Sequence, residues 1–454
     1  MTVLRKLSKQ SAISLSLLAL SSTTPFLTAH ADEAFSKDSR WMLGDWDGTR
    51  QKLLDDGYSL IGKYVGETAT NIHGGYDKNS KFGYADQFVF GLNVDLQKTI
   101  GLNNADVQLF ITDRNGSDFT ADRLPDPRTG QVGSSMEVAG RGQIWRVSQL
   151  WFHQVYLNGA VDLKVGRGSP SEDFQSFPCD FQNLSFCSAQ AGVWAADDWY
   201  SFPVSVWGTR VKVQVAPELY LQVGAYEHNR TELEHDNGFK MSTSGANGVN
   251  VPIELLWTPQ HALLGLPGEY RLGAYHINMR ANDIFEDANG QPRALTGAAP
   301  RTRSERTGVW LMARQQIAQF GSDSNRPVEV FAQAHANDRN TSFVDRFYSA
   351  GIVATGAFDS RPKDQIGLAV SSIHVNSKIR EAQQLLNQSS GASTYSDPEY
   401  VPLQGTEYDS ELYYGIHATN WLTIRPNIQF VHNPGAVKQV DDAWVGGLKI
   451  VTQF

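Results

Sequence analysis

The sequence lacks any apolar run of the roughly 20 residues that a membrane-spanning helix needs, and its mean hydropathy is −0.35. This absence excludes a helical membrane protein. It does not exclude a transmembrane β-barrel, in which lipid-facing and lumen-facing residues alternate, so that every window averages to a mild hydropathy.

Cysteine is scarce, with two residues in the chain, Cys179 and Cys187, which enclose the short segment "DFQNLSF". Two thiols with no histidine nearby would leave a zinc site half empty. In an exported chain, the simpler interpretation is one disulfide that closes a loop. The sequence therefore predicts a Cys179–Cys187 disulfide, no metal site and no cofactor.

Basic residues are outnumbered, because 39 Lys and Arg face 48 Asp and Glu, which gives a formal net charge of −9. Nucleic-acid binding requires a basic face, so this balance argues against it. The chain also contains no G-x-S-x-G and no H-E-x-x-H motif, so neither a serine hydrolase nor a zinc protease is indicated. We therefore expect a protein that is not an enzyme.

The first residues resemble a secretory signal. Arg5, Lys6 and Lys9 precede the apolar stretch "SAISLSLLAL", and Ala29 and Ala31 have the small-x-small spacing of a cleavage site. An anchoring helix is the alternative, but the apolar stretch is too short to span a bilayer. We expect residues 1–31 to be removed, which takes three cations away and leaves 423 residues with a net charge of −12.

Glycine and aromatic residues are abundant, with 40 Gly, 22 Phe, 16 Tyr and 11 Trp, a composition that suits an outer-membrane barrel. Residues 32–57 are predicted to form an N-terminal segment with one short amphipathic helix in "GDWDGTRQKLLDDGYSL". In this helix Asp47 would be the N-cap and Gly57 would end the helix.

From residue 58 onward the hydrophobic period is two, as in "VDLKVG", "RVKVQV" and "VEVFAQAHAN". The apolar faces stay apolar from strand to strand, while the other faces carry Arg, Lys, Gln, His and Tyr. A soluble β-sandwich also alternates, but we find no second layer to cover the polar faces. We count about sixteen such segments, so residues 58–454 are predicted to form an all-β, closed antiparallel transmembrane barrel. Both chain ends would lie on the periplasmic side.

Two connections are too long for turns, residues 115–147 and residues 167–206. Loops of this length are usually functional or disordered. The second contains the cysteine pair and many aromatic residues, so we expect it to fold into the barrel.

Several stretches are similar to the OprB-type carbohydrate-selective porins: "DWDGTRQKLLDDGYSL", "ITDRNG", "VYLNGAVDLKVGR" and "LTIRPNIQFVHNPG". The similarity runs over the whole chain after the signal. It implies a sixteen-stranded outer-membrane channel for simple sugars such as glucose, narrowed by inward-folded loops that bear charged and aromatic residues. Asp47 departs from the family, which commonly has glycine there.

A channel that prefers a neutral sugar needs fixed donors and acceptors at its narrowest point and benefits from an aromatic surface. We expect Arg114 to face the pore, because it continues the lumen-facing series of its strand, although an arginine at the membrane interface is the alternative. The remaining pore candidates come from the two long connections: Glu137, Arg141, Trp194, Asp197, Asp198 and Trp199. The alternative for Glu137 and Arg141 is an ordinary solvated loop. The two tryptophans could instead pack the loop onto the barrel wall or lie in an aromatic girdle. His228 and Arg230 are weaker lumen candidates.

The predicted function is selective passive uptake of monosaccharides through an outer-membrane channel. A general or anion-preferring diffusion porin is the nearest alternative, because the arginines could attract anions. A secreted adhesin or sugar-binding sandwich is a third class, which would be soluble without detergent.

The chain ends in "WVGGLKIVTQF". As a closing strand, this segment would turn Trp444, Leu448, Ile450 and Phe454 toward outer-membrane lipid, and Lys449 and Gln453 into the water-filled lumen. Phe454 also resembles the last-residue signal by which the barrel assembly machinery recognises its substrates.

Overall fold

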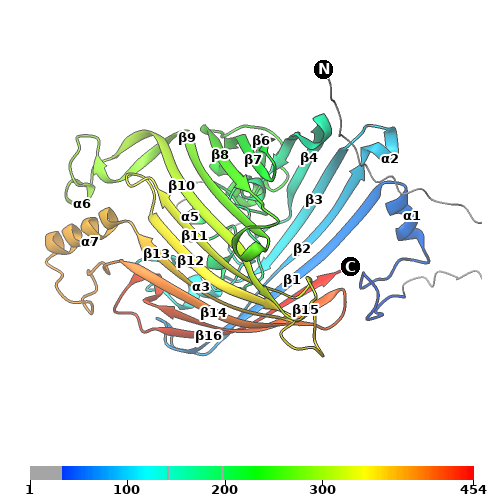
Figure 1. The fold of residues 1–454 in the computed structure, drawn as a ribbon. Coiled ribbons are helices and arrows are strands. Elements are labelled where there is room, and N and C mark those ends of the chain that lie inside the picture. Colours follow the sequence, from blue (N-terminus) through cyan, green and yellow to red (C-terminus); the bar gives the residue numbers. More distant parts are fainter. Residues whose placement is uncertain (1–32, 141–142, 196–198) are drawn as a thin grey trace, which may run out of the picture.

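The computed structural model describes residues 33–140, 143–195 and 199–454. Sixteen antiparallel strands form one closed barrel in which each strand pairs with its neighbours in sequence and β1 pairs with β16 (Figure 1). The predicted fold class and strand number are confirmed. The strands are β1 (Tyr58–His73), β2 (Phe82–Asp95), β3 (Ala105–Gly116), β4 (Arg146–Tyr156), β5 (Val161–Gly168), β6 (Val206–Ala216), β7 (Leu219–His228), β8 (Gly248–Trp257), β9 (Gly268–Asp287), β10 (Pro300–Gln319), β11 (Pro327–Asn337), β12 (Val344–Thr355), β13 (Gln365–Val375), β14 (Thr406–His417), β15 (Leu422–His432) and β16 (Ala443–Gln453).

The two faces of the strands differ as the alternation predicts. Leu272 and Leu311 on the outer face are 58% and 55% exposed, whereas Glu254 on the inner face is fully buried. The outer face is therefore the apolar one and the inner face is the polar one, which is the arrangement of a barrel in lipid. Within the described ranges, no helix has both the length and the apolar character needed to cross a membrane.

The last strand closes the barrel. β16 pairs with β1 in a register that runs from Lys63 opposite Gln453 to His73 opposite Trp444. The amide of Phe454 donates to Gly62 O at 2.9 Å, so the final residue extends this ladder. A side chain at position 62 would press on the Phe454 ring, since its Cβ would lie 3.1 Å from Phe454 Cβ.

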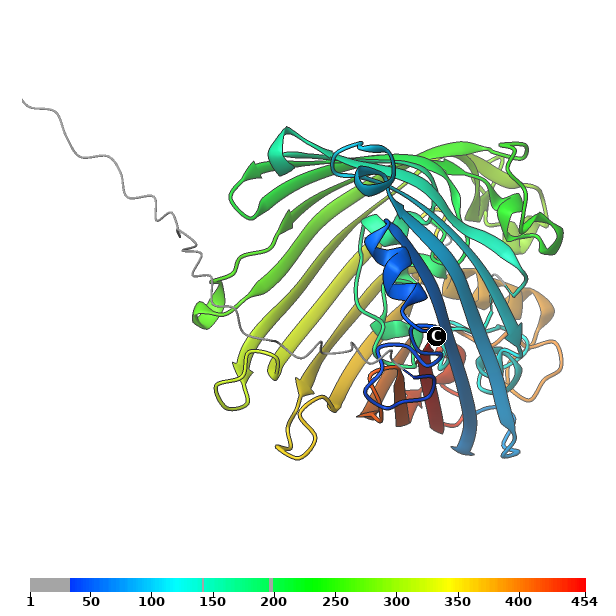
Figure 2. The same cartoon turned by 90° about the vertical axis from the view of Figure 1, so that its right-hand side faces the viewer.

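The two ends of the barrel have different connections. The turns at one end include the short segments 157–160 and 217–218, whereas the opposite end carries the long loops 117–145, 169–205 and 376–405. The described N-terminal segment and the C-terminus lie together at the short-turn end (Figure 2). Short turns face the periplasm in bacterial outer-membrane barrels. The placement of both chain ends on the periplasmic side stays a prediction, and residues 1–32 lie outside the described residues.

The N-terminal helix α1 (Thr49–Asp55) is present, but its predicted cap is wrong. Asp47 has the left-handed φ of 54° and does not cap the helix. Gly48 occupies the N-cap position, and Asp45 Oδ1 accepts the Gly48 amide at 3.1 Å. The helix ends at Asp55, and Gly57, the residue predicted to end it, follows the C-cap Asp56 with a left-handed φ of 96°.

The remaining helices lie in the connections between strands, and Figure 1 shows α7 projecting from the loop-bearing rim. Helix α7 is not among the predicted elements, because its apolar residues are few. The α-helices are α2 (Leu96–Ile100), α3 (Phe119–Arg123), α4 (Pro170–Asp173), α5 (Ala191–Trp194), α6 (Arg293–Thr296) and α7 (Ser377–Ser390). The 3₁₀ turns are η1 (Leu157–Gly159), η2 (Leu184–Phe186), η3 (Arg230–Leu233), η4 (His235–Asn237), η5 (Leu263–Gly265) and η6 (Pro434–Ala436).

The loop that joins β3 to β4, described over residues 117–140 and 143–145, folds into the barrel (Figure 2). Its buried Met136 and Val138 pack against Val65 on the inner face of β1. The amide of Val138 also donates to Glu67 Oε2 at 3.1 Å. Apolar contacts and a hydrogen bond to the polar face of β1 thus hold this loop, which we call the first inward loop.

The second inward loop joins β5 to β6 and is described over residues 169–195 and 199–205. It lies on other parts of the same wall. Its Tyr200 belongs to an apolar cluster that includes Trp310 on β10. The ammonium of Lys449 on β16 donates to Phe181 O at 2.8 Å. The prediction that this loop folds into the barrel is confirmed.

Candidate pore constriction

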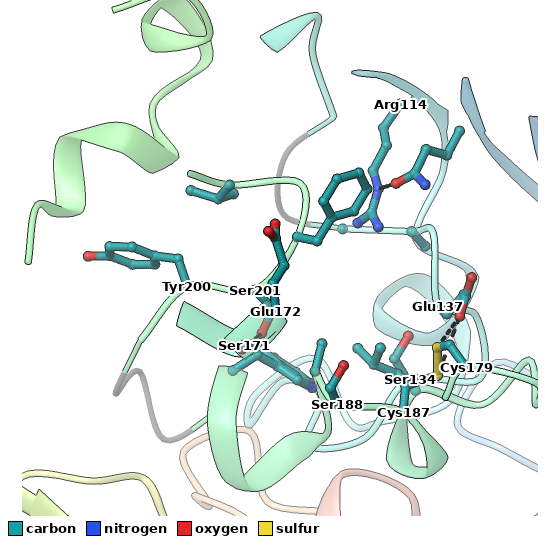
Figure 3. A pocket seen from close by; sticks show the side chains of 18 of the residues that line it. Arg114, Ser134, Glu137, Ser171, Glu172, Cys179, Cys187, Ser188, Tyr200 and Ser201 are labelled. Atoms are coloured by element: carbon teal, nitrogen blue, oxygen red, sulfur yellow. Dashed lines mark hydrogen bonds between the residues drawn. A yellow bond between two sulfur atoms is a disulfide. The ribbon is translucent and has the colours of Figure 1, made fainter. Parts of the chain in front are cut away.

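A cavity of about 510 Å³ lies where β1 to β3 face the two inward loops (Figure 3). It brings together four of the predicted pore residues and both cysteines, which come from segments far apart in sequence. These residues are Arg114, Glu137, Trp194, Trp199, Cys179 and Cys187.

Arg114 stands at the end of β3 and faces this cavity rather than the membrane interface. Its Nε donates to Gln87 Oε1 at 2.7 Å on the neighbouring strand. This bond limits the rotation of a long side chain. The guanidinium therefore presents donors to the cavity in a fixed direction, as planar recognition of hydroxyls requires.

Glu137 of the first inward loop is the acidic side chain nearest the disulfide (Figure 3). Its Oε2 lies 3.1 Å from Lys449 Nζ on β16 and contacts both cysteine sulfurs. Glu137 therefore pairs with a cation of the wall and is more than a solvated loop residue. Glu137 and the two cysteines do not offer a metal site, because disulfide sulfurs have no thiolate to donate.

The predicted disulfide between Cys179 and Cys187 is present. Lys449 Nζ donates to Cys179 O at 3.1 Å, next to its bond with Phe181 O. Lys449 faces inward as predicted, but the expectation that it meets water is wrong. Its side chain is buried, because the second inward loop fills that part of the lumen.

The two tryptophans of the second inward loop differ in exposure. Trp199 is only 2% exposed, and its ring centroid lies 5.4 Å from that of Tyr275 and 5.5 Å from that of Trp310. It packs the loop onto the wall, which is the alternative considered for the pair. Trp194 is partly exposed and retains ring surface toward the cavity.

Other predicted residues fall elsewhere. Arg141, Asp197 and Asp198 lie outside the described residues. His228 is buried at the end of β7 against the Tyr200 ring, and neither it nor Arg230 of η3 lines the cavity.

Several cavity residues are additional to those predicted from the sequence, among them Lys63, Gln87, Ser134 and Glu172. Lys63 and Gln87 lie on polar faces of strands, so the same alternation that identified Arg114 could have found them. Ser134 and Glu172 lie in the inward loops, where no period indicates which way a side chain points.

Glu172 is the second carboxyl group at this cavity. Burial raises its pKa to about 7, against the opposing effect of the Lys164 ammonium, which lies 3.7 Å away. Its Oε1 accepts the Ser169 amide at 3.3 Å and completes a capping box at the start of α4. Its charge therefore changes near neutral pH.

The site thus combines a fixed guanidinium, two carboxyl groups and a partly exposed indole around one narrow space. These groups can hydrogen-bond hydroxyls and cover an apolar ring face. Such an arrangement is suited to weak, reversible binding during passage.

Comparison with known proteins gives consistent matches. Residues 79–454 match the family described as "Carbohydrate-selective porin, OprB family". The chain is 50% identical to Porin B of Pseudomonas aeruginosa over 426 residues, which is 94% of each chain. It is 36% identical to the putative porin QuiX of Acinetobacter baylyi over 430 residues, which is 93% of this chain and 95% of the other.

Among solved structures, the high-pH structure of Pseudomonas putida OprB superposes with a TM-score of 0.91 at 50% identity. The match covers 93% of this chain and all of that one. The low-pH structure of the same protein superposes with a TM-score of 0.57 and covers 92% of this chain.

Proposed function

Because the chain belongs to the OprB family of carbohydrate-selective porins, we propose that its solutes are monosaccharides such as glucose. They would pass the outer membrane through the cavity between the wall and the inward loops. Arg114 and Glu137 would exchange their hydrogen bonds with sugar hydroxyls, and the Trp194 ring would contact the apolar face of the sugar. The proposal includes removal of residues 1–31 as a signal peptide. Mass spectrometry of the purified protein should find Asp32 first.

The observation that supports this proposal most directly is the convergence of Arg114 and Glu137 on one cavity with a partly exposed tryptophan. Arg114 comes from β3, whereas the other two come from different loops. A non-selective pore needs only a water-filled opening, so it does not require an aromatic ring beside a fixed guanidinium. A sugar site needs fixed donors and acceptors and benefits from an aromatic surface.

The experiment is ion conductance of the pure channel in planar bilayers, with glucose added. We expect glucose to reduce the current in a saturable way, because a bound sugar obstructs the ions. Arg114→Ala should raise the glucose concentration that gives half-maximal block roughly tenfold, since the change removes hydrogen bonds from a charged donor. Arg301→Ala is the matched control, because Arg301 lies at the start of β10 and pairs with Glu286.

Two results would contradict parts of the proposal. Unchanged block in Arg114→Ala would reject the role of that residue. No block by any monosaccharide, together with a preference for anions in a salt gradient, would favour the general or anion-preferring porin and leave the barrel unaffected.

A further inference from the structure

Three carboxyl groups on β14 point into the barrel and contact loops rather than solvent. Glu407, Asp409 and Glu411 occupy alternate positions of the strand, and each is at most 3% exposed. The residues between and beyond them face outward, as Tyr408 and Leu412 show with exposed fractions of 47% and 46%. The inner face of β14 is therefore a row of three buried acids.

The row holds both inward loops by hydrogen bonds. The amide of Gly133 in the first inward loop donates to Glu407 Oε1 at 2.8 Å. In the second inward loop, Ser185 Oγ donates to Asp409 Oδ2 at 2.7 Å.

Glu411 makes the most bonds with the second loop. It accepts the amide of Gln182 at 3.0 Å and the amide of Asn183 at 2.6 Å. Backbone amides donate to it from two successive residues, so this carboxyl group fixes the course of the main chain. Cys179 lies three residues before Gln182 and lines the cavity.

The loops also bond to each other where the row holds them. The amide of Leu184 in the second loop donates to Ser134 O in the first at 2.9 Å. Gln429 on β15 donates to Ser135 O at 3.0 Å and accepts from Asn183 Nδ2 at 3.1 Å. A shift of the second loop at β14 would therefore move Ser134, which lines the cavity.

From these contacts we propose that Glu407, Asp409 and Glu411 are positioning residues that set the width of the constriction by fixing both inward loops to β14. They act through the loops and need not touch the solute. Buried carboxyl groups suit this role because each offers acceptor oxygens to the amide and hydroxyl donors of the loops. An acceptor of fixed length on a rigid strand also defines where the loop backbone must lie.

The test is single-channel conductance of the full chain in planar bilayers. Glu411→Gln replaces one acceptor oxygen with an amino group, which faces the loop amides with a donor. We expect the conductance to rise roughly twofold, because the loop moves away from β14 and widens the passage. Glu411→Asp keeps both acceptor oxygens, so its conductance should stay closer to that of the parent.

The matched control is Asp106→Asn. Asp106 is a carboxylate of the inner wall whose bonds go to Asn93 and His153 on neighbouring strands, and among the described residues no inward loop contacts it. This variant should keep the parent conductance to within about a fifth. Heat-modifiable migration on gels shows that each barrel is folded, a property that loop position does not affect.

A folded Glu411→Gln channel with the parent conductance would overturn the proposal. If that variant does not fold, the loop-side change Ser185→Ala decides instead. It should raise the conductance, and adding Asp409→Asn should raise it little further, because both remove one bond. If the effects of Ser185→Ala and Asp409→Asn on conductance add fully, or if neither variant changes the conductance, the positioning role of the three acids is rejected.

The inference rests on the proposed function only in treating this cavity as the route of the sugar. Conductance is measured without sugar, so the two proposals fail separately. A parent channel that glucose does not block would reject sugar selectivity, and the response of conductance to Glu411→Gln would still test the positioning role.

Discussion

The barrel wall and the two inward loops follow different physical rules. The wall is a continuous ladder of backbone hydrogen bonds from β1 to β16. Each strand there needs only alternation of apolar and polar residues to choose its outer face. The inward loops have no such period and depend on side chains of the wall, such as Glu67 for Val138 and Glu411 for Asn183.

This difference indicates that the two regions can be perturbed separately. A change in the wall should alter how much barrel forms and leave the pore of the surviving molecules intact. A change in the loops should alter the pore and leave the amount of barrel intact. The predictions below test this separation, beginning with the largest expected effect.

Deletion of Phe454 addresses the wall. It removes the last bond of the β1–β16 ladder and a ring that lies 6.2 Å from the Phe88 ring on the outer face. We expect the amount of folded, inserted barrel to fall roughly tenfold, because closure protects the sheet edges. The amount is measured by heat-modifiable migration of outer-membrane extracts.

Channels that do insert without Phe454 should show the parent conductance and glucose block. Phe454→Tyr keeps the aromatic ring and serves as the control, with nearly the parent amount of barrel. A normal amount of deleted protein, or inserted channels with an altered pore, would contradict the separation of wall and loops.

Two tryptophans of the same loop offer a matched pair. Trp199→Ala should remove packing worth about 3–5 kcal/mol, so the second inward loop becomes accessible to protease and the conductance rises. Trp194→Ala should leave conductance and protease resistance unchanged and weaken glucose block roughly three- to tenfold, since one ring face is lost. If both variants gave the same result, the difference in exposure between Trp194 and Trp199 would not separate a packing role from a sugar-binding role.

A smaller effect is expected from pH. The pKa of Glu172 is about 7 because the group is buried, so the carboxyl is mostly neutral below that pH and mostly anionic above it. The preference of the channel for cations over anions should therefore increase, roughly twofold, as pH rises from about 6 to about 8. Reversal potentials in a salt gradient measure this preference.

Glu172→Gln cannot ionise, so it should show a flatter pH profile with the parent conductance. A profile as steep as that of the parent would assign the pH dependence to another group and remove Glu172 from the charges that ions meet in the constriction.

Part of the constriction could be predicted from the sequence alone. Arg114 follows from strand parity, because Asp106, Gln108, Phe110 and Thr112 precede it on the same face. The disulfide follows from two cysteines in an exported chain. Trp194 and Trp199 were identified together, but their sequence context is alike, and only packing against Tyr275 and Trp310 separates a buried anchor from an accessible ring.

Other parts could not be predicted from local pattern. The acids of "TEYDSELYY" are visible as an alternating row, yet the sequence does not say that loop groups 224 to 274 residues away will meet them. Such contacts form only after the barrel closes, because closure brings β14 opposite the loops that follow β3 and β5. The predicted cap Asp47 is wrong because the backbone of Asp47 is left-handed in the turn before α1. Gly48 occupies the N-cap position instead.

The barrel follows from features of the amino-acid sequence: a composition rich in glycine and aromatic residues, a hydrophobic period of two, the number of such segments, and a last strand that ends on an aromatic residue. These features are local or repeat along the chain, so they can be recognised without knowing which segments meet. The width of the passage and the side chains that face it follow only from the tertiary structure. That width depends on two loops without a period of their own, and their positions are set by hydrogen bonds to a distant part of the wall.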